Sequence, residues 1–182
     1  MRVITGSAKG RKLCAPTGLK TRPTPSIVKE SVFSAIQFEV EGAAVLDLFA
    51  GSGQMGIEAL SRGARSCVFV ENSKAVLAVT ERNVESTGFL EKSRLVPGDA
   101  KSYVQGAKGP FDIAFLDPPY KSPGLDKILP VLGGIMSGSG IIICETDSIN
   151  TLPEKAGPLA KHREYRYGKT KITIYRNMEG SE

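Results

Sequence analysis

The sequence predicts an α/β fold built on a doubly wound, mostly parallel sheet. Short apolar or β-branched runs alternate with segments of helical spacing, as expected when helices cover both faces of a parallel sheet. A glycine-rich G-x-G-x-x-G stretch directly follows the first run and opens the next helix. At 182 residues, 41% of them hydrophobic, the chain has the size of one globular domain with a sizeable core.

Five runs have the near-continuous apolar character of buried strands. The predicted strands are, in order, 43–50, 66–71, 93–98, 111–117 and 140–146. Between them the spacing predicts a helix over 54–63 that ends at Gly63 and another over 73–87, from a Ser73 cap to Gly88. A third predicted helix, over 122–134, is interrupted at Pro130.

The two ends of the chain depart from this alternation. Residues 2–16 indicate a basic β-hairpin around "SAKG", and 26–36 has the pattern of an amphipathic helix. Residues 162–175 predict two strands joined near Gly168 and Lys169, forming an antiparallel edge. We therefore expect a basic N-terminal extension over 1–25, a main domain over 26–177 and a short tail over 178–182.

The charges are unevenly distributed, although the net charge is only +5. Residues 1–29 hold seven Lys or Arg and no acid, and residues 155–176 hold seven against one acid. The middle of the chain carries more acids than bases. Two acid-poor ends on one small domain favour a polyanionic partner, and nucleic acid is the first candidate.

Cysteine and histidine are too sparse for a disulfide framework or a metal site. Cys14, Cys67 and Cys144 lie far apart without a C-x-x-C pair, and His162 is the only histidine, so we expect no bound metal. No apolar run is long enough to span a membrane, and the N-terminus lacks the apolar block of a secretory signal. We expect a cytoplasmic protein that has no membrane partner and acts as a monomer.

The stretch "VLDLFAGSGQMGIEAL" predicts a site for a nucleoside-bearing cofactor. Gly51, Gly53 and Gly56 form G-x-G-x-x-G between a strand and a helix, and Glu71 follows 20 residues after Gly51. Such glycines let the backbone approach a ligand, and an acid at this distance can hold ribose hydroxyls. The fingerprint alone does not distinguish a dinucleotide from S-adenosylmethionine as the cofactor.

Asp47 favours S-adenosylmethionine. An acid just before the glycines would repel a pyrophosphate but attract a sulfonium or ammonium group. Asp99, after the third strand, can accept from an adenine amino group or cap a helix. Asp47, Glu71, Asp99 and Asp117 all fall at the ends of predicted strands, where open parallel sheets bind ligands.

The quoted motifs carry a resemblance to a known family. "DLFAGSGQMGIEALSRGA", then "VFVE", "GDA" and "FDIAFLDPPY", resemble class I S-adenosylmethionine-dependent methyltransferases, and "DPPY" resembles the motif of those that methylate exocyclic amines of bases. "RVITGSAKGRKL", "TRPTPSIVKESVFSAI" and "YGKTKITIY" resemble the bacterial RsmD family, which methylates N2 of one guanine in 16S ribosomal RNA. Gln54, Met55 and "PSIVKES" depart slightly from the family's pattern.

The resemblance implies a Rossmann-like, seven-stranded methyltransferase domain over 26–177 and a role for each motif. It implies cofactor contacts by Asp47, Phe49, Gly51, Gly53, Gly56, Glu71, Asp99 and Ala100. It implies that Asp117 and the Pro118 carbonyl accept N–H bonds from the target amine while Tyr120 stacks on the extruded base. The expected RNA-binding residues are Arg2, Lys9, Arg11, Lys12, Arg22 and Lys169.

The implied partner is 16S rRNA or a small-subunit assembly intermediate. Two other functions stay open on the sequence. "DPPY" is also typical of adenine-N6 methyltransferases acting on DNA or RNA, although the chain leaves no room for a separate target-recognition domain. A non-catalytic RNA-binding module is the other alternative, which the intact cofactor and base motifs disfavour.

Overall fold

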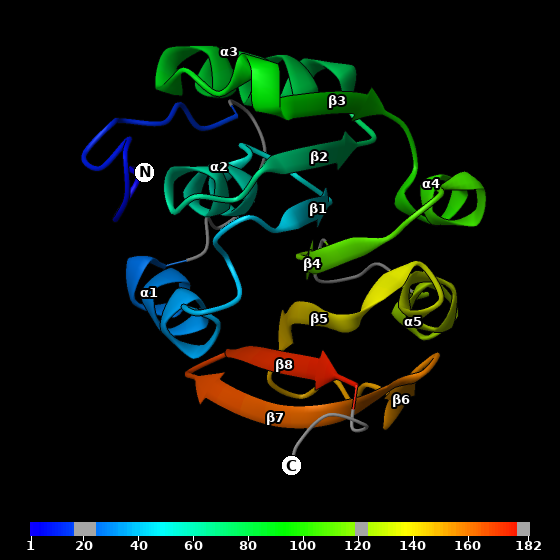
Figure 1. Cartoon of the computed structure of the whole chain (residues 1–182). Helices are drawn as coiled ribbons and strands as arrows, with labels where there is room; N and C mark the ends of the chain where they lie inside the picture. The colour runs from blue at the N-terminus through cyan, green and yellow to red at the C-terminus, as the bar shows by residue number, and fades with distance from the viewer. Residues whose placement is uncertain (17–24, 119–123, 178–182) are drawn as a thin grey trace.

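The apolar runs of the sequence form the centre of an eight-stranded sheet with helices on both faces (Figure 1). The structure, a computed structural model, describes residues 1–16, 25–118 and 124–177. The strand order is β3-β2-β1-β4-β5-β8-β7-β6. The first five strands run parallel and are β1 (Ala44–Leu48), β2 (Ser66–Glu71), β3 (Ser93–Pro97), β4 (Phe111–Leu116) and β5 (Met136–Asp147).

The antiparallel edge consists of the last three strands. These are β6 (Lys155–Ala156), β7 (Leu159–Tyr167) and β8 (Thr170–Arg176), and β8 pairs with β5. Gly168, with φ +60°, makes the predicted turn between β7 and β8. The antiparallel edge is thus confirmed, with one strand more than the seven that were predicted, because β6 adds a two-residue pairing.

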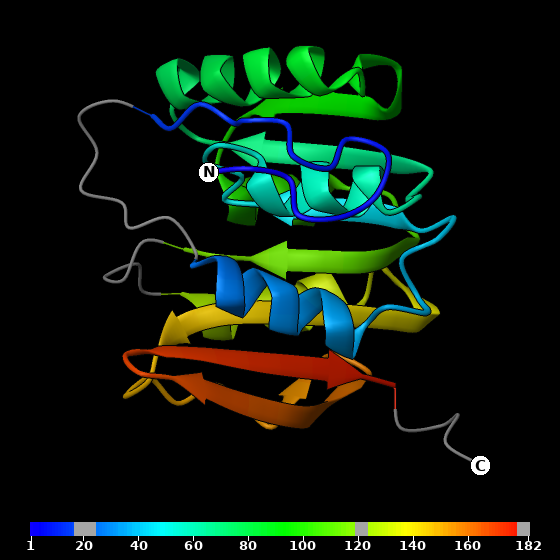
Figure 2. The same ribbon diagram turned by 90° about the vertical axis from the view of Figure 1, so that its left-hand side faces the viewer.

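In the described part of the chain, five α-helices cover the sheet. Figures 1 and 2 show α1 (Ser26–Ala35), α2 (Gln54–Ser61) and α3 (Lys74–Thr87) on one face and α4 (Ala100–Gly106) and α5 (Leu125–Gly133) on the other. A short 3₁₀ turn, η1 (Leu90–Lys92), follows α3. Each face has its own hydrophobic core cluster, which accounts for the near-continuous apolar strands.

The sheet reverses its direction of growth between β1 and β4. The chain builds β1, β2 and β3 outward on one side and then returns to place β4 on the other side of β1. Ligands of such sheets bind outside the carboxyl ends of the strands at this switch point. The glycine loop after β1 and Asp117 after β4 therefore lie at the same edge.

Residues 1–14, here called the arm, lie along α2 on the face shared with α1 (Figure 2). Val3, Ala8 and Leu13 belong to the core cluster of that face. The predicted hairpin is reduced to one antiparallel bridge between Arg2 and Lys12. Backbone bonds, such as that from the Val3 N–H to the Arg11 carbonyl at 3.0 Å, join the two sides of the arm, and apolar burial and polar contacts with α2 hold it to the domain.

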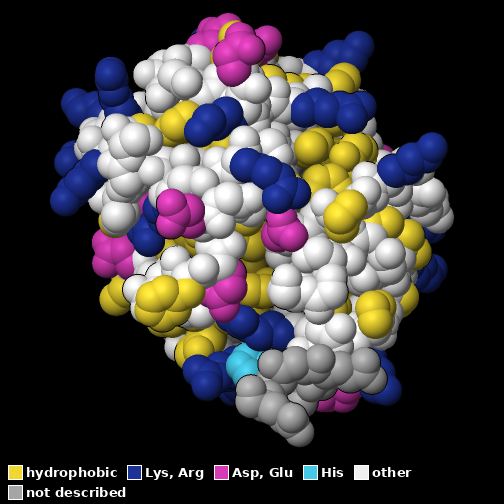
Figure 3. All heavy atoms as spheres, viewed as in Figure 1, with side chains coloured by type: hydrophobic (Ala, Val, Ile, Leu, Met, Phe, Trp, Pro, Cys, Tyr) yellow, Lys and Arg dark blue, Asp and Glu magenta, His cyan; other side chains and the backbone are white. Residues whose placement is uncertain are grey.

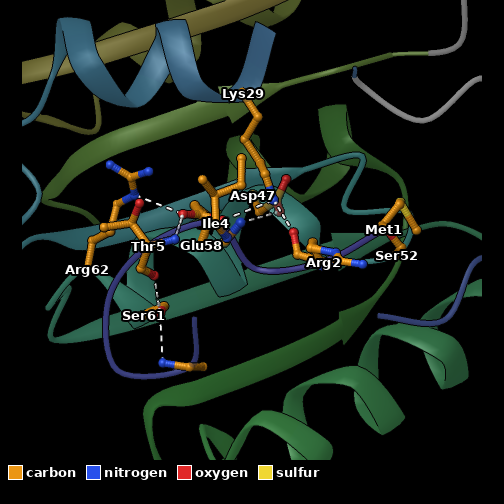
Figure 4. Close-up of polar contacts among 12 residues, drawn as sticks. Met1, Arg2, Ile4, Thr5, Lys29, Asp47, Ser52, Glu58, Ser61 and Arg62 are labelled. Carbon is orange, nitrogen blue, oxygen red and sulfur yellow. Dashed lines mark hydrogen bonds and ion pairs between the residues drawn. The ribbon is translucent and has the colours of Figure 1, made fainter. Parts of the chain in front are cut away.

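Buried Glu58 of α2 is the main polar anchor of the arm (Figure 4). Its carboxylate accepts backbone N–H bonds from Ile4 at 2.8 Å and Thr5 at 3.0 Å. Lys29 of α1 lies 3.0 Å from the same carboxylate and donates to the Arg2 carbonyl at 2.9 Å. Glu58 and Lys29 have side chains 0% and 2% exposed, and Arg62 at the end of the same helix also pairs with Glu58 at 2.9 Å. These contacts together compensate the burial of the charges.

Two helices differ from the prediction. Helix α5 continues through Pro130, and the predicted interruption is wrong. The bond that Pro130 cannot make is to the carbonyl of Asp126, an exposed residue in the first turn where water can replace it. Helix α4 had not been predicted, because its seven residues are too few for a clear period.

None of the helices in the described ranges has the length and apolar character needed to cross a bilayer. Within those same ranges, no group of three or more His, Cys, Asp or Glu side chains is placed to hold a metal ion. The thiols of Cys14, Cys67 and Cys144 are free, and only that of Cys14 is exposed.

Gly6→Ala should destabilise the protein more than Gly10→Ala. Both glycines have positive φ, +86° and +83°, so either alanine costs about 1 kcal/mol of backbone strain. Only at Gly6 does a Cβ also collide with α2, 1.7 Å from the Ser61 carbonyl oxygen. We expect the Gly6 variant to unfold at a temperature lower by about 4 °C or more than the Gly10 variant. Equal melting temperatures would contradict this packing of the arm.

Candidate functional site

The glycine loop between β1 and α2 is shaped by close packing on one side and left open on the other. A Cβ at Gly56 would lie 2.4 Å from the Phe69 ring and one at Gly53 would lie 2.7 Å from the Thr80 methyl group, so both glycines permit tight contact with β2 and α3. At Gly51, with φ +58°, a Cβ would meet only the Phe49 carbonyl oxygen, at 3.8 Å. Gly51 is therefore the point where a ligand can approach the backbone.

Asp47 lies buried beneath this loop. Its Oδ2 accepts the N–H of Gly56 at 3.0 Å, and the residue is only 3% exposed. Burial raises the pKa of Asp47 from 3.8 to about 7, the nearby Glu71 carboxylate adds to the rise, and the Gly56 bond opposes it. This bond ties Asp47 to the first turn of α2, and the predicted contact of Asp47 with the methyl donor stays a prediction.

Glu71 joins the loop to the end of β2. One carboxylate oxygen accepts the N–H of Gly51 at 3.1 Å and the other accepts the N–H of Ser73 at 2.9 Å. A carboxylate has about four lone-pair directions, so oxygens fixed in this way can still accept ribose hydroxyls. The structure thus brings Glu71 to the glycine loop, as its spacing predicted.

A hollow of about 470 Å³ extends from the loop across the end of β4. Its lining joins the ends of β1 and β4 to the starts of α4 and α5, and comprises Phe49, Asp99, Lys101, Pro118, Gly124, Leu125, Asp126, Lys127 and Ile128. This is a size typical of small-molecule sites. Phe49 is held at φ +66°, an uncommon conformation for a residue with a side chain, which places it at the rim.

Asp99 caps α4 and lines the same hollow. It accepts from the backbone N–H of Ser102 at 2.9 Å, and this bond lowers the pKa of Asp99 below 3.8. Both interpretations of the sequence are compatible with this geometry, since a capping carboxylate at an exposed rim retains free lone pairs. Ala100, the next residue, is buried.

The predicted base-binding corner begins where β4 ends. Asp117 is exposed and Pro118 is buried, so this corner joins the core to the surface. Pro118 lines the hollow together with Phe49, which places this corner and the glycine loop on one cavity. Tyr120 lies outside the described residues, as does Arg22.

The predicted RNA-binding residues that the structure describes are exposed but lie at different distances from this edge. Both ends of the arm lie toward the carboxyl ends of the strands, where Cys14 contacts Asn83, whereas its tip lies at the far end of α2 (Figure 2). At the tip, the Ser7 N–H donates to the carbonyl of Ser61, the last residue of α2. Arg2 and Lys12 are paired by a backbone bridge, and Lys9 belongs to the turn at the tip. Arg11 lies on the strand returning from the tip. Lys169 lies beside the end of β5, where its carbonyl accepts from the Ser148 N–H at 2.8 Å. Basic and acidic side chains are interspersed at the amino ends of the parallel strands (Figure 3).

Sequence reasoning missed four buried polar residues that hold the site together. Thr80 donates to the Gly51 carbonyl at 2.7 Å and Asn83 donates to the Ser52 carbonyl at 2.9 Å. Glu58 and Lys29 anchor the arm. A charge within the otherwise apolar face of α2 was the available signal for Glu58. Nothing in the sequence pattern distinguishes Asn83 from a surface residue of α3.

Comparison with known proteins gives consistent matches over almost the whole chain. The family described as "Conserved hypothetical protein 95" matches residues 1–176. The protein YlbH of Bacillus subtilis is 39% identical over 181 residues, which cover 97% of this chain and 98% of YlbH. Ribosomal RNA small subunit methyltransferase D of Escherichia coli K12 is 32% identical over 184 residues, with 100% of this chain and 92% of that protein covered.

Solved structures agree. The structure of yhhF from Escherichia coli has a TM-score of 0.87, is 32% identical and is covered over 97% of both chains.

Asp47→Asn should change how stability depends on pH. The folded protein keeps the Asp47 proton up to a pKa of about 7, whereas the unfolded chain loses it near 3.8. Between these values the free energy of unfolding of the native protein therefore falls as pH rises, by up to about 1.4 kcal/mol per pH unit. An asparagine side chain does not titrate, so the free energy of unfolding of the variant should not show this fall. Measured by urea denaturation, the stability of the variant relative to the native protein should therefore rise from pH 4 to pH 7. Parallel pH profiles would refute the assignment, and exposed Asp126→Asn serves as the control.

Proposed function

We propose that this chain, which belongs to the RsmD family of rRNA methyltransferases, transfers a methyl group from S-adenosylmethionine to N2 of a guanine in 16S rRNA. S-adenosylmethionine is the cofactor of this family of enzymes. The observation that carries the proposal is the shared cavity at the switch point, lined by Phe49 after β1 and by Pro118 after β4.

The residues around the glycine loop fit the cofactor. The open side of Gly51 gives the cofactor access to the backbone, Glu71 can accept its ribose hydroxyls and Asp99 can accept its adenine amino group. When bound there, S-adenosylmethionine supplies an electrophilic methyl group on a sulfonium. Asp47 acts from beneath by fixing the first turn of α2, and a cation bound nearby would favour its ionised form.

Asp117 and Pro118 would orient the target amine. The lone pair of an exocyclic guanine amine is delocalised into the ring, so the amine is a poor nucleophile. Acceptors that hold its N–H groups turn the lone pair toward the methyl group. The exposed Asp117 carboxylate and the Pro118 carbonyl are such acceptors, and the fixed φ of proline keeps them in place. Alignment would then supply most of the rate enhancement.

The target base must leave its RNA surroundings to reach this corner. We assign Tyr120 as the stacking partner of the extruded base. Arg2, Lys12 and Lys169 flank the edge where the base would enter, and we assign them, with Lys9, Arg11 and Arg22, to contacts with RNA phosphates. In this proposal the enzyme acts as a monomer in the cytoplasm, on 16S rRNA or on a small-subunit assembly intermediate.

Asp117→Ala tests the base-binding half of the site. We expect transfer to small-subunit particles to fall by roughly 10²-fold or more, because an acceptor that positions the amine is lost. The affinity for S-adenosylhomocysteine, measured by calorimetry, should stay within a few-fold. Asp126→Ala is the matched control, since Asp126 is also an exposed aspartate and lines the hollow that Pro118 lines. Normal turnover by the Asp117 variant would refute the assigned role.

Charge reversal tests the RNA-binding half. Arg2→Glu combined with Lys12→Glu should weaken binding to 16S rRNA and reduce its salt dependence, because fewer counterions are released from phosphates. The control is Lys155→Glu, which changes an exposed lysine on β6, away from the arm. Unaltered affinity and salt dependence in the double variant would show that the arm does not bind RNA.

A further inference from the structure

Asn83 of α3 contacts two segments that have different roles in the proposed reaction. Its Nδ2 donates to the Ser52 carbonyl at 2.9 Å and to the Cys14 carbonyl at 3.0 Å. Its Oδ1 accepts the Cys14 N–H at 2.8 Å. Ser52 belongs to the glycine loop and Cys14 is the last residue of the arm. One side chain thus bonds both the cofactor loop and the segment that carries Arg2 and Lys12.

The geometry leaves Asn83 no freedom. The Cys14 N–H requires an oxygen acceptor, and the two carbonyls require donors, so the orientation of the amide is fixed by its partners. The residue is 1% exposed, which leaves little room for water to replace a lost partner. Movement of either segment would leave a buried polar group of Asn83 unpaired. The positions of the loop and the arm are therefore interdependent.

Thr80, one helical turn earlier, provides a contrast. It donates to the Gly51 carbonyl at 2.7 Å and is fully buried, but its other hydrogen bond, to the Val76 carbonyl, stays within α3. Thr80 therefore holds the cofactor loop without bonding the arm. Thr80 shapes the loop only, whereas Asn83 also links the loop to the arm.

We propose that Asn83 is a positioning residue that makes the methyl donor and the RNA bind cooperatively. The inference rests on the proposed function, in which the glycine loop holds the donor and the arm holds RNA. A ligand that shifts one segment toward its bound position also shifts Asn83, and hence moves the other segment toward the position in which it binds its own ligand. Linkage requires that each ligand tighten the other by the same factor, typically about 5- to 150-fold.

The test measures this factor directly. S-adenosylhomocysteine is titrated calorimetrically into the native protein with and without saturating 16S rRNA transcribed in vitro. RNA should tighten its binding by at least about fivefold, and the reciprocal experiment should give the same factor. In Asn83→Ala the factor should fall to near one while both ligands still bind. Thr80→Val, the matched control, should weaken cofactor binding and keep the factor.

A coupling factor that is unchanged in Asn83→Ala would overturn the inference. A coupling factor of one in a native protein that still methylates 16S rRNA would also overturn the inference. This result would leave the proposed function intact. A native protein that binds neither 16S rRNA nor small-subunit particles would overturn both. If Asn83→Ala does not fold, Asn83→Asp replaces it, because aspartate keeps the shape and the acceptor for Cys14 but loses both amide donors. Retained coupling in that variant would equally contradict the role of Asn83.

Discussion

The backbone of α2 lies directly against β2 because position 56 carries no side chain. A Cβ there would come within 2.4 Å of the Phe69 ring and 2.6 Å of the Cys67 sulfur, so any larger residue would lift the helix from the sheet. This contact sets the position of the first turn of α2, which Asp47 fixes from below at 3.0 Å. The open side of Gly51, the orientation of Glu71 and the hollow beyond them all follow from that placement.

The same helix also determines where the arm lies. Glu58 is on α2, and it receives the backbone of the arm and Lys29 of α1 in a buried ionic site. Removal of one partner from such a buried pair typically costs roughly 3–5 kcal/mol. Apolar contacts alone would allow the arm to slide, whereas these directional bonds fix its register. A short helix thus orders both the cofactor loop and the proposed RNA-binding segment.

Local patterns predicted the regions whose structure depends on local physics. The apolar runs, the Ser73 cap, the Gly88 stop and the glycine loop with Glu71 are visible in sequence because they follow from period, capping and backbone freedom. The arm could not be predicted, since its path depends on Glu58 and Asn83, which are 54 and 69 residues distant from their partners Ile4 and Cys14. The burial of Asp47 likewise depends on how closely α2 approaches the sheet.

In the proposed reaction, one cavity aligns a methyl donor held by the glycine loop with a base amine held at Asp117. The measurement that tests it most directly is nucleoside analysis of product after incubation with labelled S-adenosylmethionine and unmethylated small-subunit particles, naked 16S rRNA or duplex DNA. If the enzyme methylates guanine N2 as proposed, label will appear in N2-methylguanosine from small-subunit RNA. Label in N6-methyladenine, or tight RNA binding without transfer to any substrate, would contradict it.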